Sequence, residues 1–217
     1  MNKALLEILI HLFTVLPFIY IFRNKGNERS KKLVLLFIFY FISNQLLLNL
    51  PLYFSSFQFI NYYWNWSGKI LAVVGSLIFY FYFKDWFQPY HFIRFRQEKA
   101  SQRKVYIVMA IISIIAITEG ILFYYKSWNL ETLPFQLTLP GIDEEIAYRG
   151  IMLGILSSVM SEKIKIFKVE ITHPSIWING LLFGMIHALR LNPEWKLKFN
   201  VFNKNIYSGI NLGMDGH

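Results

Sequence analysis

The sequence predicts an all-α protein, a polytopic bundle of about six to seven transmembrane helices. Apolar residues make up 55% of the 217-residue chain and charged residues only 16%, whereas a soluble domain carries about 25% charged residues. The stretch 33–68 has no charged side chain and is far longer than the roughly 20 residues that one spanning helix needs. The basic residues, which give a formal net charge of +9, lie in short clusters between the apolar runs, as expected for the loops of a membrane protein.

Each predicted span rests on its own apolar run. The first begins after three residues and lacks a small-residue cleavage signal, so we expect a retained helix and not a signal peptide. The second and third divide the charge-free stretch, and Tyr62, Tyr63 and Trp64 form the aromatic cluster typical of a membrane interface. The fifth begins near Pro140, which suits a first helical turn. The predicted spans are 4–22, 33–52, 64–83, 105–125, 139–160 and 175–189, with a weaker seventh at 199–214.

The loop charges predict an orientation. The 23–32 and 84–104 connections are rich in Lys and Arg, whereas 53–63 carries no charge and 126–138 carries one base. Because basic loops stay in the cytoplasm, we expect these two basic connections inside and the N-terminus outside.

Composition also limits the possible functions. The chain has no cysteine, which excludes a disulfide framework, a thiol nucleophile and a cysteine-ligated metal. Since the basic clusters are explained by membrane topology, we expect the lipid bilayer as a partner and no nucleic acid.

Ionisable residues at the start of the fifth span point to chemistry. Asp143, Glu144 and Glu145 follow one another there. Glu145 and Arg149 are four residues apart and can pair on one helix face, whereas Glu144 lies about 100° around the helix with Tyr148 as its own i+4 neighbour. One carboxylate can therefore be held by the arginine while the other accepts a proton, an arrangement suited to acid–base catalysis. A helix N-terminus that simply favours acidic residues is the alternative.

The sixth span supplies a second polar stripe. Asn179, Phe183 and His187 are spaced i, i+4 and i+8 and share a helix face. Counting helical rise from opposite ends of antiparallel helices places His187 at a depth similar to that of the glutamates, and Glu119 of the fourth span near that level as well. A hydrogen-bonded packing histidine is the alternative.

Small residues spaced four apart in the three C-terminal segments predict close contacts between helices. These pairs are Gly150 and Gly154, Gly180 and Gly184, and Gly209 and Gly213.

The two polar motifs together resemble a known family. Glu144 to Gly150 is similar to the EExxxR motif of the CAAX-protease and bacteriocin-processing (CPBP, or ABI) family of intramembrane proteases, and Phe183 to His187 is similar to its FxxxH motif. The resemblance implies N-terminal transmembrane helices over 1–135 and a protease domain over 136–217.

It also implies roles for single residues. Glu144 would activate a water, with Glu145 and Arg149 beside it, and His187 would position that water or stabilise the developing charge. Phe183 and Asn179 would support the histidine on its helix. The sequence has no HExxH motif, so we expect no metal and no other cofactor.

The family carries a further HxxxN or HxxxD motif on a later helix. The only histidine after His187 is His217, which has no residue four positions beyond it. We therefore expect either a chain truncated before this motif or a degenerate member.

The expected function is an intramembrane endopeptidase of the bacterial plasma membrane that acts on a membrane-embedded peptide. Because the sequence is rich in Ile, Asn, Lys and Phe, we favour peptide maturation or bacteriocin self-immunity over prenyl processing. An inactive scaffold that binds a membrane partner is the main alternative, and a small transporter with an ionisable relay is a weaker one.

Overall fold

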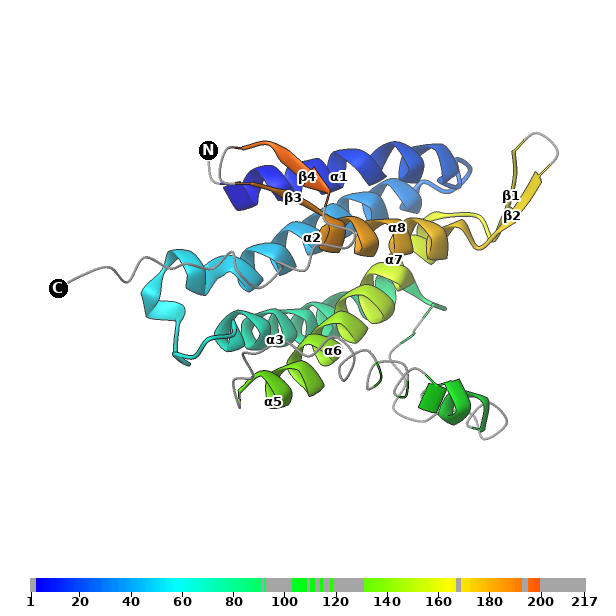
Figure 1. Cartoon of the computed structure of the whole chain (residues 1–217). Helices are drawn as coiled ribbons and strands as arrows, with labels where there is room; N and C mark the ends of the chain where they lie inside the picture. Colours follow the sequence, from blue (N-terminus) through cyan, green and yellow to red (C-terminus); the bar gives the residue numbers. More distant parts are fainter. Residues whose placement is uncertain are drawn as a thin grey trace. The chain divides into compact units, whose positions relative to one another are not determined.

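The structure is a computed structural model that describes residues 3–90, 92, 103–108, 110–111, 114, 118, 131–166, 169–192 and 195–199 (Figure 1). It confirms the all-α class. The helices are α1 (Lys3–Phe22), α2 (Arg29–Tyr53), α3 (Trp66–Phe83), α5 (Thr132–Leu137), α6 (Leu139–Glu144), a π-helical segment (Glu145–Met152), α7 (Leu153–Val159) and α8 (Pro174–Ala188), with short 3₁₀ turns at Ser55–Phe57 and Lys84–Phe87.

Two antiparallel hairpins accompany these helices. Strands β1 (Lys163–Ile166) and β2 (Val169–Thr172) pair with each other, and so do β3 (Leu189–Leu191) and β4 (Leu197–Phe199). The sequence did not predict either hairpin, because both follow directly on apolar helices and are too short for a clear alternation of apolar and polar residues.

The chain forms two compact units. One contains the described residues of Met1–Gln45, Trp86–Tyr90 and Met152–His217, and the other contains those of Leu46–Asp85 and His91–Ile151. The prediction of a domain boundary between residues 135 and 136 stays a prediction.

Three helices within the described part of the chain are long and apolar enough to cross a membrane, namely Lys3–Phe22, Arg29–Tyr53 and Trp66–Phe87. They match the predicted spans 4–22, 33–52 and 64–83. The predicted span 139–160 is divided among α6, the π-helical segment and α7, and the predicted span 175–189 is the 15-residue α8. Most of the predicted spans 105–125 and 199–214 lies outside the described residues, so a total of six to seven spans stays a prediction.

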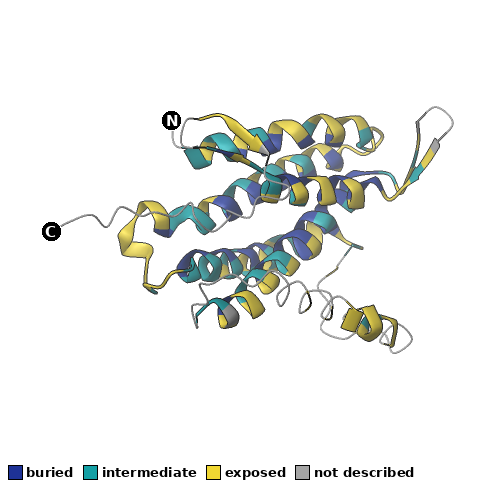
Figure 2. Ribbon diagram, viewed as in Figure 1, coloured by how far each residue is buried: buried dark blue, intermediate teal, exposed yellow. Residues whose placement is uncertain are grey.

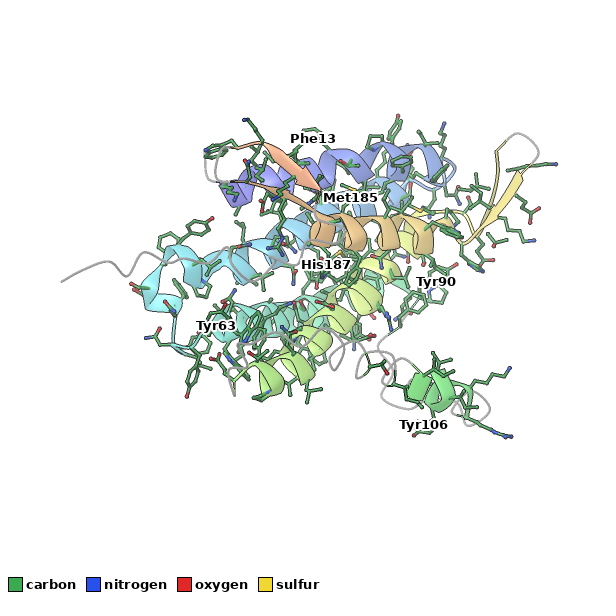
Figure 3. All side chains as sticks on the ribbon, in the orientation of Figure 1. Phe13, Tyr63, Tyr90, Tyr106, Met185 and His187 are labelled. Carbon is green, nitrogen blue, oxygen red and sulfur yellow. The ribbon has the colours of Figure 1, made fainter. Side chains whose placement is uncertain are left out.

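Helix α1 shows how an apolar helix divides its surface between protein and lipid. Its buried residues recur every three or four positions and form one face (Figure 2): Ile8, His11, Leu12, Val15 and Ile19. Large apolar side chains on the other side are exposed, for example Phe13 at 70% (Figure 3). An exposed apolar face of this length fits contact with acyl chains, because lipid tails are as apolar as the side chains.

Contacts within the first unit agree with the predicted sidedness of the loops. The Asn24 N–H donates to the Val159 carbonyl (3.0 Å), and the Ser158 hydroxyl donates to the Phe87 carbonyl (3.1 Å). The ends of α1 and α7 and the residues after α3 therefore lie together, as expected if the basic connections share one side of the membrane.

The second unit depends on a close approach between the end of α2 and the start of α3. A Cβ atom at Gly68 would meet the Leu48 carbonyl oxygen and the Asn65 amide, and one at Gly75 would meet the Leu47 side chain. Asn65 also caps α3 by accepting from the Gly68 N–H (3.0 Å) and donates to Leu48 (2.8 Å). Only glycine fits at position 68 without moving backbone atoms.

The predicted glycine contacts are confirmed at one position. A Cβ at Gly154 would lie 2.9 Å from the Tyr90 carbonyl oxygen and 3.0 Å from the Phe87 ring. No described atom lies within 4 Å of a Cβ built at Gly180 or Gly184, so the prediction is wrong for this pair within its own unit. The third pair, Gly209 and Gly213, lies outside the described residues.

The Gly68 contact predicts a stability effect. Gly68→Ala should lower the free energy of unfolding by about 1–3 kcal/mol, because overpacking forces the surrounding backbone to move. The matched control is Gly180→Ala, which adds the same methyl group where no described atom lies within 4 Å. Thermal unfolding of both variants in detergent measures the effect. A Gly68→Ala midpoint equal to that of wild type would contradict the close approach.

Loop sidedness can be tested with single cysteines, since the chain has none of its own. A membrane-impermeant maleimide added to intact cells should label Tyr62→Cys but not Lys25→Cys or Lys165→Cys. The reason is that α2 is the expected span between residues 25 and 62, and that basic loops stay inside the cell. Labelling of Lys25→Cys and Tyr62→Cys from the same side would rule out α2 as a span.

Candidate functional site

The acidic motif lies where α6 passes into a π-helical segment. Helix α6 begins at Leu139 with Pro140 in its first turn and ends at Glu144, and the π-helical segment begins at Glu145. Asp143 is buried, Glu144 is half-buried and Glu145 is exposed. Single π-helical turns occur frequently at functional sites, so this geometry supports the choice of the motif as a candidate site.

A lysine that the sequence analysis overlooked lies against this motif. The Lys69 Nζ atom is 2.7 Å from Asp143 Oδ2 and 3.9 Å from Glu144 Oε1. The exposed fractions of the three side chains are 17% for Lys69, 5% for Asp143 and 30% for Glu144. The contact follows from the packing of α3 against α6. The sequence did contain a signal, because Lys69 is the only charged residue of α3, and an ionisable residue inside an apolar span indicates a functional site.

The predicted pair of Glu145 and Arg149 is confirmed. Arg149 Nη1 lies 2.8 Å from Glu145 Oε1. Both side chains are more than half exposed in the described structure, at 57% for Glu145 and 74% for Arg149. This pair is local to one helical stretch, which explains why the i+4 spacing was sufficient to predict it.

Two described cations are shared unequally among the three carboxylates of the motif. Three consecutive carboxylates face two cations: Asp143 contacts Lys69 directly, Glu145 contacts Arg149 directly, and Glu144 is the more distant partner of Lys69. An opposite charge stabilises the ionised form of a carboxylate more strongly at shorter distance. Of these three contacts with a cation, that of Glu144 is the longest.

The FxxxH motif forms the predicted stripe on α8. Asn179 is buried, Phe183 is half-buried and His187 is exposed near the end of the helix (Figure 3). The Phe183 and His187 rings have centroids 4.3 Å apart, and His187 Nδ1 lies 2.8 Å from the Phe183 carbonyl oxygen. Because a carbonyl can only accept, Nδ1 must carry the proton, and the lone pair of the neutral imidazole is then on Nε2.

Helix α1 fixes the strand that follows His187. The Leu191 N–H donates to Glu7 Oε1 (2.8 Å), and His11 Nε2 lies 3.1 Å from the Leu189 carbonyl oxygen. Glu7 and His11 are four residues apart in a largely apolar helix, a pattern that the sequence analysis did not use. Their backbone contacts hold β3 and so set where the histidine-bearing end of α8 stops.

Glu131 connects the start of α5 to the residues before α3. Its carboxylate accepts from the Tyr63 N–H (3.0 Å), the Trp64 N–H (3.1 Å) and the Trp66 indole N–H (2.7 Å). The Trp64 ring stacks on Phe135, with centroids 5.3 Å apart. This cluster fixes α5, and through it α6, beside α3 and brings the acidic motif to Lys69. The sequence analysis missed Glu131, although it is the only acidic residue of its connection.

The predicted site residues fall into two groups. Glu144, Glu145 and Arg149 belong to one compact unit, together with Lys69. The other unit contains the second group, Asn179, Phe183 and His187. The approach of the glutamates to the histidine stays a prediction, and Glu119 lies outside the described residues. No group of three or more metal-ligating side chains is found in the described part of the chain, and whether the protein uses a metal stays untested.

Comparison with known proteins supports the resemblance. The family model Type II CAAX prenyl endopeptidase Rce1-like matches residues 126–210. The match confirms the resemblance drawn from the two motifs, and its range includes every predicted site residue. Comparisons with curated proteins and with solved structures found no match. Together with the three membrane-length helices, the match indicates an integral membrane protein.

The Glu131 cluster predicts a stabilising role for this carboxylate. Glu131→Gln replaces one acceptor oxygen with an NH₂ donor that cannot accept from the backbone or indole N–H groups, so the free energy of unfolding should fall by about 1–3 kcal/mol. Glu170→Gln is the matched control, because Glu170 forms an exposed ion pair with Lys163, and such pairs contribute about 0–1 kcal/mol. Equal unfolding midpoints for the two variants would contradict the role.

Proposed function

We propose that this chain, in which residues 126–210 match the Rce1-like type II CAAX prenyl endopeptidases, is an intramembrane endopeptidase. Its substrate is a membrane-embedded peptide, and its nucleophile is a water activated by Glu144. The observation that carries the proposal is the position of Glu144 within the acidic motif: it is half-buried and lies 3.9 Å from Lys69, whereas Asp143 and Glu145 lie 2.7 and 2.8 Å from their cations.

The proposed reaction begins with proton transfer from water to Glu144. The resulting hydroxide attacks the scissile carbonyl, and the proton then passes from Glu144 to the leaving amine, so that the carboxylate is regenerated. Glu145 is instead engaged in an ion pair with Arg149 (2.8 Å). Its carboxylate is therefore less available to a water molecule than that of Glu144.

His187 supports this reaction by orienting the water. With the Nδ1 proton directed to the Phe183 carbonyl, the neutral imidazole presents Nε2 as an acceptor for a water O–H. Stabilising the oxyanion would instead require a proton on Nε2, and while Nδ1 donates to the Phe183 carbonyl this makes the ring an imidazolium. The geometry therefore favours the role of positioning the water.

The membrane setting completes the proposal. We place the protein in a bacterial plasma membrane as a bundle of six to seven spans, with a role in peptide maturation or bacteriocin self-immunity. The three membrane-length helices and the family match support an intramembrane enzyme of this kind.

The role of Glu144 can be tested directly. Glu144→Gln is almost isosteric and should lower kcat by about 10²–10⁴-fold, since it removes general base catalysis. The assay is cleavage of prenylated and unprenylated membrane peptides by the purified protein in liposomes, with the unfolding midpoint as a control for folding. Glu145→Gln is the matched variant and should retain more activity.

The outcomes separate the alternatives. Turnover that persists in Glu144→Gln and vanishes in Glu145→Gln would exchange the roles of the two carboxylates. A folded wild-type protein that cleaves none of these peptides would contradict the protease proposal and favour a membrane scaffold.

A further inference from the structure

We propose that Lys69 is a positioning residue for Glu144: it pairs with Asp143 and thereby holds a positive charge beside the catalytic carboxylate. This inference rests on the proposed function of Glu144. It adds a residue that lies outside the matched range 126–210 and contributes to the site from α3.

The location of Lys69 is difficult to explain by solubility or by topology. It lies one turn inside α3, a helix apolar enough to span a membrane, and its side chain is only 17% exposed. A basic residue that determines topology lies instead in a loop at the membrane surface. An ammonium group within a span is costly unless it is paired, so such residues are kept where they act with a partner.

The distances give Lys69 two different partners. Asp143 is in direct contact at 2.7 Å and is almost fully buried, so this pair fixes where the ammonium group lies. Glu144 is 3.9 Å away and more accessible, so the ammonium group that Asp143 fixes also lies beside this carboxylate. A carboxylate whose surroundings are fixed in this way can meet a water molecule in a defined geometry, as a general base must.

The surrounding contacts hold the ammonium group in register with the motif. Gly68, the preceding residue, lies against the Leu48 carbonyl oxygen, and Asn65 caps the same turn of α3. The Glu131 carboxylate also accepts a hydrogen bond from the Trp66 indole, which connects the start of α5 to this turn of α3. Lys69 therefore lies on a constrained helix end, as precise placement of a charge requires.

A second interpretation is that Lys69 only neutralises Asp143 and stabilises the fold. Both interpretations predict that Lys69→Met is unstable, since it leaves Asp143 buried without its cation. The double variant Lys69→Met with Asp143→Asn separates them, because it removes both charges of the pair together and should fold. If Lys69 has only a structural role, this variant should regain the wild-type kcat together with stability.

Under the positioning role, the double variant should have an unfolding midpoint near that of wild type but a kcat about 10–100-fold lower, the size expected when a catalytic group is misplaced. KM should change little, because Lys69 is proposed to act on Glu144 and not on the substrate. Lys69→Arg keeps the charge and should retain most of the activity. The matched control is Lys31→Met with Glu28→Gln, which removes an exposed ion pair and should leave kcat unchanged.

The result also distinguishes this inference from the proposed function. Wild-type kcat in a stable double variant would overturn the positioning role, even where Glu144→Gln abolishes cleavage and the proposed function holds. Cleavage that persists in Glu144→Gln would overturn the role of Glu144 and, with it, the positioning role of Lys69. If wild type cleaves no peptide, the proposed function and the positioning role both fail, and the unfolding midpoints then measure only the structural coupling of Lys69 with Asp143.

Discussion

A charge placed among apolar helices needs a partner of opposite sign, and the ion pair between Lys69 and Asp143 meets this requirement at 2.7 Å with both side chains largely buried. Removing either charge alone would leave the other charge buried without a partner. Such a pair therefore tolerates little change in the distance between its two groups. Helices α3 and α6 must therefore keep their packing and their register. The position of Glu144 follows from this, because it is the next residue on α6.

The backbone around this pair is held by a small number of specific contacts. At the start of α3, Gly68 allows the end of α2 to approach closely, and Glu131 binds three N–H groups from residues 63, 64 and 66. In the other unit, Glu7 and His11 perform a comparable task by binding the backbone of β3 after His187. In both units, the side chains of acidic residues or histidine thus bind main-chain groups that an apolar environment cannot satisfy.

The membrane explains the division between buried and exposed surfaces. Apolar side chains such as Phe13 are exposed on α1, where a soluble protein would place polar residues. The driving force for helix packing is weak between such faces, because lipid competes equally well for them. Ion pairs, hydrogen bonds to the backbone and close contacts at glycine consequently determine which helices pack together.

The sequence by itself determined those features that depend on neighbours along the chain. Apolar length predicted α1, α2 and α3, and the i+4 spacing predicted the pair of Glu145 with Arg149 and the contact of Phe183 with His187. Helical geometry fixes such contacts without reference to the rest of the fold. The two motifs on these stretches also predicted the resemblance that the match over residues 126–210 confirmed.

Only the tertiary structure decided which distant residues meet. Lys69 and Asp143 are 74 positions apart, and His11 and Leu189 are 178 apart. The spacing of residues along one helix cannot predict such pairs, because they depend on which helices pack and in what register. The partner of Asp143 was for this reason visible in the sequence only as an isolated lysine in an apolar helix, and the structure identified it as the cation that Asp143 shares with Glu144.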